Sequence, residues 1–430
     1  MQPSAPSILL LLALSWFPPA ACASAAAFSP TIGINYGQVA NNLPSPEAVI
    51  PLLRSVGAGH VKLFDTNPRI LRPFAGTTFD FVVGLPDDLI PKVRDPAAAL
   101  SWIKSNIQPY LPRTKITAVT VGNEVLTGNN TKFIQNLLPA IQSLHSALAS
   151  LGLDRQVAVT TAHSLNVLSA SFPPSAGAFR RDLLPFVSSL INFLNKSGSP
   201  FLINAYPFFA YRGDPQRVSL DYAVFRQNAG VVDPATGLRY SNMLHAQVDA
   251  VLTAIAAAGG GKTVDVRVSE TGWPSAGDDD EVGASPQNAR TYNGNLMKMV
   301  AEGKGTPMRP GSPLQVYVFA LFNENMKPGP ASERHYGLFK PDGTPAYDIG
   351  VALPAINTSS GGVSGVGTGG SEGGEGFPDQ SADDTYTNSY FTFSSALGGR
   401  SALAPEGTRR AAAVAGVAAA AAGFLCKFVT

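Results

Sequence analysis

Charged side chains are scarce in this sequence, because Asp, Glu, Lys and Arg together make up only 14% of its 430 residues. Soluble domains usually contain about a quarter. The 31 basic and 30 acidic residues leave a formal net charge of +1. No run of Lys or Arg is long enough to neutralise a nucleic-acid backbone. The sequence therefore argues against a nucleic-acid partner and suits an uncharged polymer such as a neutral polysaccharide.

Cysteine is almost absent, and its two residues, Cys22 and Cys426, lie near the ends of the chain. The five histidines show none of the spacings typical of a zinc site. We therefore expect no metal, no cofactor and no disulfide-rich carbohydrate-binding module. An exported protein without disulfides depends on a large core, which favours one large domain.

The first 26 residues are typical of a secretory signal peptide. A short apolar run, Ile8–Trp16, precedes the small-residue stretch Ala20–Ala27. The run is shorter than the roughly 20 residues that a membrane span needs. A buried first helix is the alternative.

The last residues, 396–430, are typical of a propeptide for glycolipid (GPI) attachment. Small residues at Ser394–Gly399 precede a polar spacer and the apolar tail Ala411–Leu425. A short tail anchor or a packed helix are the alternatives. We expect a monomer on the outer face of the plasma membrane or in the cell wall, in contact with the membrane only through its lipid.

Between these ends we expect one domain over residues 27–356 and a flexible Gly/Ser-rich linker over 357–395. Asn129, Asn195 and Asn357 begin possible glycosylation sequons.

Short β-branched apolar runs alternate with helix-like segments throughout the expected domain. Apolar strands between amphipathic helices predict a parallel sheet covered by helices, and eight such units predict a (β/α)₈ barrel. A doubly wound open sheet is the rival arrangement. The expected strands are Thr31–Asn35, His60–Phe64, Phe79–Val83, Ile116–Val121, Gln156–Thr160, Phe201–Ala205, Val264–Ser269 and Leu314–Phe319. The expected helices include Ser45–Ser55, Ala97–Ile107, Lys132–Ser150, Leu183–Asn195, Met243–Ala258 and Ala284–Glu302.

Two glutamates, Glu124 and Glu270, follow the fourth and seventh expected strands. The carboxyl ends of barrel strands meet at one mouth, where chemistry is done. Cleavage of a glycosidic bond needs two carboxylates, one on each side of the sugar. The alternative is that each glutamate caps a helix or forms a structural ion pair.

Polar and aromatic residues at the same strand ends are candidates for substrate contact, because aromatic rings can stack on sugar faces. The candidates are Tyr36, Asn123, Asn204, Tyr206, Trp273 and Phe322.

Several stretches at these strand ends resemble the plant β-1,3-glucanase family, glycoside hydrolase family 17. They are Gly33–Gly37, Val121–Val125, Val268–Ser275, Phe322–Asn325 and His335–Phe339, and the resemblance spans about Ser29 to Ile356. It implies a (β/α)₈ barrel that cuts internal β-1,3-glucan linkages with retention of anomeric configuration, and it is similar to a GPI-anchored subgroup.

The resemblance also implies roles for individual residues. Glu124 would be the acid/base and Glu270 the nucleophile, supported by Glu324, Lys327 and Glu333. On this hypothesis Lys327 keeps Glu270 ionised.

The second strand departs from the family pattern, with Lys62 and Phe64 where members commonly carry Arg and Tyr. Lysine keeps the charge but loses the bidentate fork of arginine. A catalytically silent protein that binds cell-wall β-glucan is therefore the alternative function. Mixed β-1,3/1,4 linkages and glucan transfer also stay open.

Overall fold

The computed structural model describes residues 31–261 and 264–350. The expected signal peptide, linker and attachment propeptide lie outside the described residues, as do both cysteines and residues 27–30 and 351–356 of the expected domain. Within the described residues, no helix is both long enough and apolar enough to cross a membrane.

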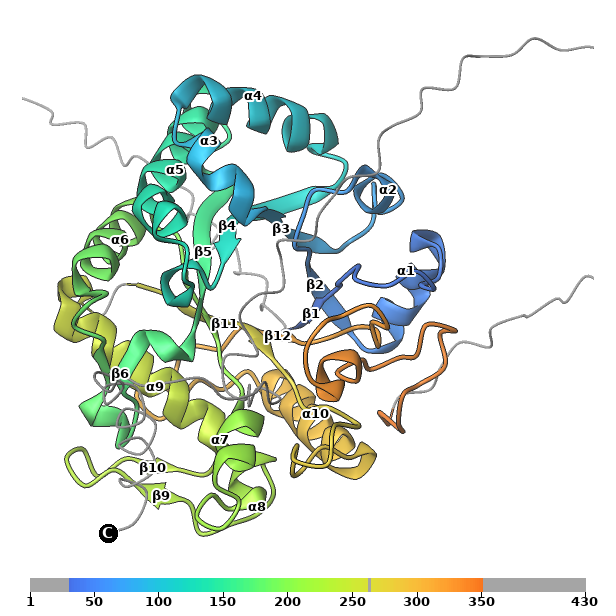
Figure 1. Ribbon diagram of the computed structural model, residues 1–430, viewed down its shortest axis with the longest axis vertical. Helices are drawn as coiled ribbons and strands as arrows, with labels where there is room; N and C mark the ends of the chain where they lie inside the picture. Colours follow the sequence, from blue (N-terminus) through green and yellow to red (C-terminus); the bar gives the residue numbers. More distant parts are fainter. Residues whose placement is uncertain (1–30, 262–263, 351–430) are drawn as a thin grey trace, which may run out of the picture.

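Eight parallel strands form a closed barrel, which confirms the predicted fold and rules out the open sheet (Figure 1). Their order around the barrel is β1-β12-β11-β8-β5-β4-β3-β2. The barrel strands are β1 (Ile32–Asn35), β2 (Ala58–Lys62), β3 (Asp80–Leu85), β4 (Lys115–Asn123), β5 (Ala158–Ser164), β8 (Phe201–Asn204), β11 (Val266–Thr271) and β12 (Val316–Val318).

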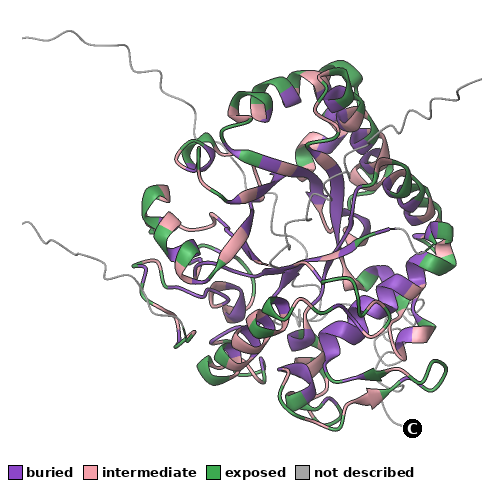
Figure 2. Cartoon of the chain, turned by 180° about the vertical axis from the view of Figure 1, so that it is seen from behind, coloured by how far each residue is buried: buried purple, intermediate pink, exposed green. Residues whose placement is uncertain are grey.

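Helices surround the barrel, and in Figure 2 the strands are mainly buried whereas the exposed residues lie on the outer helices and loops. The α-helices are α1 (Pro46–Ser55), α2 (Pro68–Leu71), α3 (Ile90–Val93), α4 (Pro96–Asn106), α5 (Thr131–Ser150), α6 (Leu184–Ser197), α7 (Pro207–Gly213), α8 (Leu220–Ala223), α9 (Met243–Ile255) and α10 (Pro286–Ala301). Short 3₁₀ turns are η1 (Asp87–Leu89), η2 (Gln108–Tyr110), η3 (Val125–Thr127), η4 (Leu165–Val167), η5 (Pro174–Ala176) and η7 (Ala331–Arg334), and a π turn is η6 (Ala256–Gly260).

Helix α5 shows how the sequence builds this outer layer. The side chain of Asn130 accepts hydrogen bonds from the backbone N–H groups of Lys132 and Phe133, which caps the helix. The buried residues Leu137, Ile141, Leu144 and Leu148 recur every three or four positions and so form one stripe against the barrel.

Helix α9 differs from the amphipathic helix that the sequence predicted, because its residues are buried on nearly every side. Two small hairpins unforeseen in the sequence explain the difference in part. They pair β6 (Leu168–Ala170) with β7 (Ala178–Phe179), and β9 (Val231–Val232) with β10 (Arg239–Tyr240). Helix α9 packs against β6, β7, β10 and η5, so both hairpins contact it.

The strand register shifts at the carboxyl ends of two strands. The β4–β5 pairing shifts between Thr120 and Asn123, and the β8–β11 pairing shifts between Val268 and Glu270. Such irregularities redirect side chains at barrel rims. Glu270 lies inside β11, whereas the sequence placed it after the strand. The two shifts adjoin Glu124 and Glu270.

Candidate active site

Asn204 joins the two glutamates at the barrel mouth. Its Nδ2 donates to Glu124 Oε1 at 2.8 Å, and its Oδ1 accepts from the Ser269 hydroxyl at 2.6 Å. Glu270, the next residue after Ser269, is paired in register with Asn204 itself. Strands β5 and β8 separate β4 from β11 around the barrel. The fold therefore brings Glu124 and Glu270 to one site from opposite parts of the mouth.

Glu270 is buried and has a different polar partner on each oxygen. Lys62 Nζ lies 2.6 Å from Glu270 Oε1, and the Tyr206 hydroxyl donates to Oε2 at 3.0 Å. Lys62 is itself only 1% exposed, although it carries a charge. A buried cation is tolerated where it is paired. Lys62, which the sequence identified only as a departure from the family pattern, thus neutralises the Glu270 carboxylate.

Glu124 has the opposite electrostatic setting. Burial raises its pKa to about 7, and the negative charge of Glu270 acts in the same direction. The hydrogen bond from Asn204 and the positive charge of Lys62 lower the pKa by less, while Glu333 raises it further. Glu124 therefore holds a proton under conditions in which an ordinary glutamate is ionised.

The three supporting residues cluster in the segment after β12. Lys327 Nζ lies 3.7 Å from Glu324 Oε2 and 3.8 Å from Glu333 Oε2, and it sits 3.9 Å from the centre of the Phe319 ring. Glu324 Oε1 accepts from the backbone N–H of Val39 at 2.7 Å, which ties this segment to the loop after β1. Lys327 thus pairs with Glu324 and Glu333, and Lys62 makes a close ion pair with Glu270. The hypothesis that Lys327 keeps Glu270 ionised stays a prediction.

The expected aromatic residues divide into two groups. Tyr36, Trp273 and Phe322 are buried, with exposed fractions of 1%, 0% and 2%, and their contact with a sugar stays a prediction. Tyr36 and Phe322 pack edge to face at 6.0 Å between ring centres. Trp273 Nε1 donates to the carbonyl oxygen of Gly283 at 2.8 Å. These three rings support the loops around the site.

Tyr206 faces the site through its hydroxyl, and the exposed ring of Phe209 lies beside it at 5.2 Å between centres. Phe209 was not among the expected contact residues, although it stands in the aromatic run Tyr206-Pro-Phe-Phe after the sixth expected strand. Asn123 is half-buried, with its Oδ1 at 3.5 Å from Asn204 Nδ2. Phe209 therefore provides an exposed aromatic surface next to Glu270's hydrogen-bond partner.

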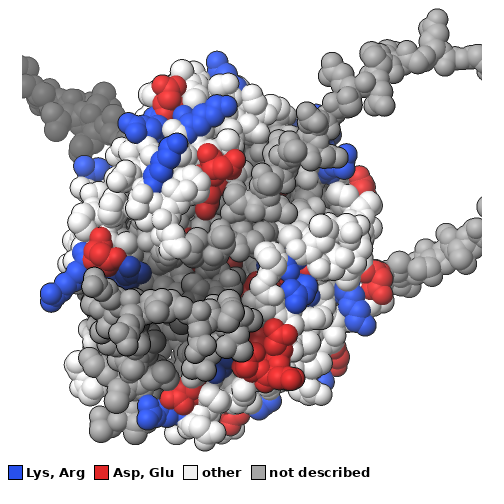
Figure 3. All heavy atoms as spheres, viewed as in Figure 1, with Lys and Arg blue, Asp and Glu red and all other residues white. Residues whose placement is uncertain are grey.

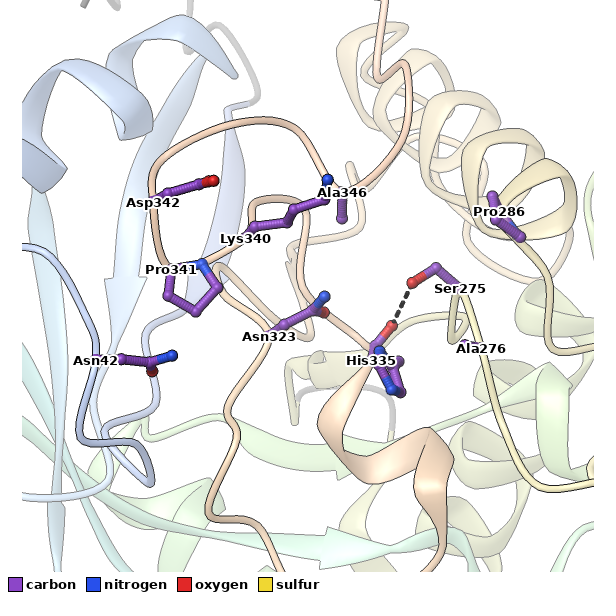
Figure 4. A pocket seen from close by; sticks show the side chains of 10 residues that line it. All are labelled: Asn42, Ser275, Ala276, Pro286, Asn323, His335, Lys340, Pro341, Asp342 and Ala346. Atoms are coloured by element: carbon purple, nitrogen blue, oxygen red, sulfur yellow. Dashed lines mark hydrogen bonds between the residues drawn. The ribbon is translucent and has the colours of Figure 1, made fainter. Parts of the chain in front are cut away.

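A hollow of about 600 Å³ opens on the same end of the barrel (Figure 4). One edge is closed by the Ser275 hydroxyl, which donates to the carbonyl oxygen of His335 at 3.0 Å. Neither Glu124 nor Glu270 lines the hollow, so it is separate from the carboxylate pair. In residues 31–261 and 264–350, no group of three or more His, Cys, Asp or Glu side chains could hold a metal ion. The residues that line the hollow are Asn42, Ser275, Ala276, Pro286, Asn323, His335, Lys340, Pro341, Asp342 and Ala346.

Residues 32–351 match the family described as glycosyl hydrolases family 17. The chain is 58% identical over 325 residues to glucan endo-1,3-beta-glucosidase 11 of Arabidopsis thaliana, covering 75% of this chain and 76% of that protein. It is 56% identical over 336 residues to glucan endo-1,3-beta-glucosidase 10 of the same plant, covering 78% and 79%.

Two solved structures resemble the fold over their whole length. A β-1,3-glucanase and allergen of Cryptomeria japonica pollen is 41% identical with a TM-score of 0.72, covering 75% of this chain and 100% of that one. One of two plant β-glucan endohydrolases with distinct substrate specificities is 38% identical with a TM-score of 0.68, covering 74% and 99%.

Glu124→Gln should stabilise the protein at pH 8 and leave its stability unchanged at pH 4. Below pH 4.5 the carboxyl is protonated in both folded and unfolded chains. Between 4.5 and about 7 the folded chain binds the proton more tightly, so stability falls as pH rises. A pKa raised from 4.5 to about 7 corresponds to a cost of about 3 kcal/mol above pH 7, which glutamine avoids. Urea unfolding at both pH values measures this, with the exposed Glu47→Gln as control. An equal gain at pH 4 would contradict the charge-based explanation.

Lys62→Met should lower the free energy of unfolding at pH 7 by about 3–5 kcal/mol, because it leaves Glu270 as an uncompensated buried charge. Lys115 offers a matched control, since it also lies 2.6 Å from a carboxylate, Asp80, but is 61% exposed. Lys115→Met should cost at most about 1 kcal/mol. Equal losses in urea unfolding would mean that burial of the Lys62 pair has no special energetic weight.

Proposed function

The chain belongs to glycosyl hydrolases family 17, and on that premise we propose that it cuts internal linkages of a β-1,3-glucan with Glu124 and Glu270. The observation that carries the proposal is the unlike setting of the two carboxyl groups. Glu270 is neutralised by Lys62 at 2.6 Å, whereas burial and charge repulsion raise the pKa of Glu124 to about 7. Two carboxyl groups in opposed environments are what an ionised nucleophile and a proton donor require.

In the proposed reaction the Glu270 carboxylate attacks the anomeric carbon, and Glu124 gives its proton to the departing sugar oxygen. A water molecule then attacks the glycosyl–enzyme ester, and Glu124 takes the proton of that water. The two inversions retain the anomeric configuration. Lys62 and Tyr206 hold the Glu270 carboxylate in place before attack and receive it again when the ester breaks. Because Glu124 must be protonated in the first step, kcat/KM should fall as pH rises through about 7.

The charge of the described surface is compatible with an uncharged substrate. On the described part of the face in Figure 3, basic and acidic side chains both occur, and uncharged areas lie between the charged groups. Phe209 offers an exposed ring for stacking on a sugar near Glu270. The relatives in Arabidopsis thaliana are named glucan endo-1,3-beta-glucosidases, which favours the β-1,3 linkage and hydrolysis over a silent binding role.

Glu270→Gln should abolish hydrolysis of laminarin, a β-1,3-glucan, and Glu124→Gln should lower kcat by about 10²–10⁴-fold through loss of proton transfer. A reducing-sugar assay measures both, and the surface change Glu47→Gln is the matched control. Proton NMR of the first products should show the β-anomer.

Binding of laminarin without product by the unaltered protein would favour the silent alternative, and an initial α-anomer would contradict retention. Faster cleavage of mixed β-1,3/1,4-glucan, or products longer than the substrate, would redirect the proposal to those activities.

We further propose export and glycolipid attachment, which place the protein as a monomer at the outer cell surface and wall. This rests on the terminal patterns of the sequence. When the full chain is expressed in plant cells, phosphatidylinositol-specific phospholipase C should release the protein from membranes. Truncation before residue 396 should instead send it directly into the medium, and membrane retention of that truncated chain would contradict the lipid anchor.

A further inference from the structure

The turn that carries Glu124 has an unusual backbone. Gly122 and Glu124 both lie in the left-handed region, with φ of 66° and 54°. Among the described non-glycine residues, only Glu124 and Phe225 have a positive φ. A left-handed residue with a side chain costs roughly 1–2 kcal/mol, so such a turn persists only where its surroundings hold it.

Strand β5 and the 3₁₀ turn η1 hold this turn from either side. The Glu124 N–H donates to the carbonyl oxygen of Ala162 on β5 at 2.9 Å. The Asn123 N–H donates to Asp87 Oδ1 at 3.0 Å. Asp87 is the first residue of η1, just beyond β3. The backbone on both sides of the Glu124 turn is therefore fixed, once by a carbonyl group and once by a side chain.

Asp87 is packed closely against the turn. A Cβ atom at Gly122 would lie 2.8 Å from Asp87 Oδ1, so the carboxyl group fits there only because residue 122 is glycine. Among residues 31–261 and 264–350, no Lys, Arg or His forms an ion pair with Asp87. Burial raises the pKa of Asp87 to about 6, and the Asn123 hydrogen bond opposes that shift. A half-buried carboxyl without a cation is unfavourable, and its hydrogen bond to the turn is the feature that explains it.

We propose that Asp87 is a positioning residue for Glu124, which holds the left-handed turn so that the Glu124 carboxyl is aimed at the departing sugar oxygen. The inference rests on the proposed role of Glu124 as proton donor. It assigns Asp87 no contact with the substrate.

This role has a specific kinetic signature. When laminarin is cleaved, the departing sugar would be an unstable alkoxide unless its oxygen is protonated. Cleavage of laminarin therefore depends on the orientation of the Glu124 carboxyl group. A 2,4-dinitrophenyl β-laminaribioside releases dinitrophenolate, a stable anion that needs no proton in the first step. A misdirected Glu124 should therefore slow laminarin cleavage and leave the burst of dinitrophenolate nearly unchanged.

The test compares Asp87→Ala, Asp87→Asn and the control Asp88→Ala, whose side chain is exposed beside Asp87. Asp87→Ala should lower kcat on laminarin about 10–100-fold, change KM by less than about twofold, and change the burst rate by less than about threefold. Asparagine keeps an oxygen acceptor for the Asn123 N–H, so Asp87→Asn should return to within about threefold of the unaltered protein. Asp88→Ala should match the unaltered protein.

The amplitude of the dinitrophenolate burst counts the folded active sites in each sample, so kcat on laminarin is calculated per active site and partial misfolding of Asp87→Ala does not obscure the result. Equal losses on both substrates, or no loss on laminarin, would overturn the positioning role. Glu124→Ala, measured alongside, should show the same bias toward the dinitrophenyl substrate more strongly. Absence of that bias in Glu124→Ala would refute the proposed function itself, whereas its presence there and absence in Asp87→Ala would refute only this inference.

Discussion

The ion pair between Lys62 and Glu270 is the interaction on which the site depends. Glu124 and Glu270 face one barrel mouth, and the buried ammonium of Lys62 lies 2.6 Å from Glu270. That cation makes the two carboxyl groups unequal, because it neutralises Glu270 while burial and the charge of Glu270 raise the pKa of Glu124. Without this inequality the two groups would compete for the same protonation state, and neither of the two proposed roles would be defined.

Around that pair, the site is built mainly by hydrogen bonds that cross from strand to strand. Asn204 on β8 donates to Glu124 on β4 and accepts from Ser269 on β11. Asn35 on β1 donates to the carbonyl oxygens of Ser269 and Val318 at 3.1 and 3.2 Å. These amide side chains link strands that pair with different neighbours. The carboxyl groups are thus held by the closed barrel as a whole, which suits the preorganised geometry that the proposed double displacement requires.

Several parts of this arrangement could be predicted from the sequence, and others could not. The apolar strands placed Glu124 and Glu270 on the fourth and seventh barrel positions, because strand alternation is a local pattern. The pairing of Lys62 with Glu270 could not be predicted from the sequence, since 208 residues separate them along the chain. Trp273 belongs to a specific motif, yet the packing of Phe208, Tyr211 and Tyr292 encloses its ring. The sequence did not indicate a role for Asp87, because its hydrogen-bond partner is a backbone N–H group, which every residue except proline carries.

The sequence by itself determined the alternation of strands and helices and placed two glutamates at strand ends, a pattern that fits both a barrel and an open sheet. These features follow from residue periodicity and from motifs read within short stretches. Only the tertiary structure decided which lysine neutralises Glu270, which aromatic rings are exposed, and how the left-handed turn at Glu124 is held. Those features depend on distances between residues far apart in the chain, and closure of the barrel alone fixes such distances.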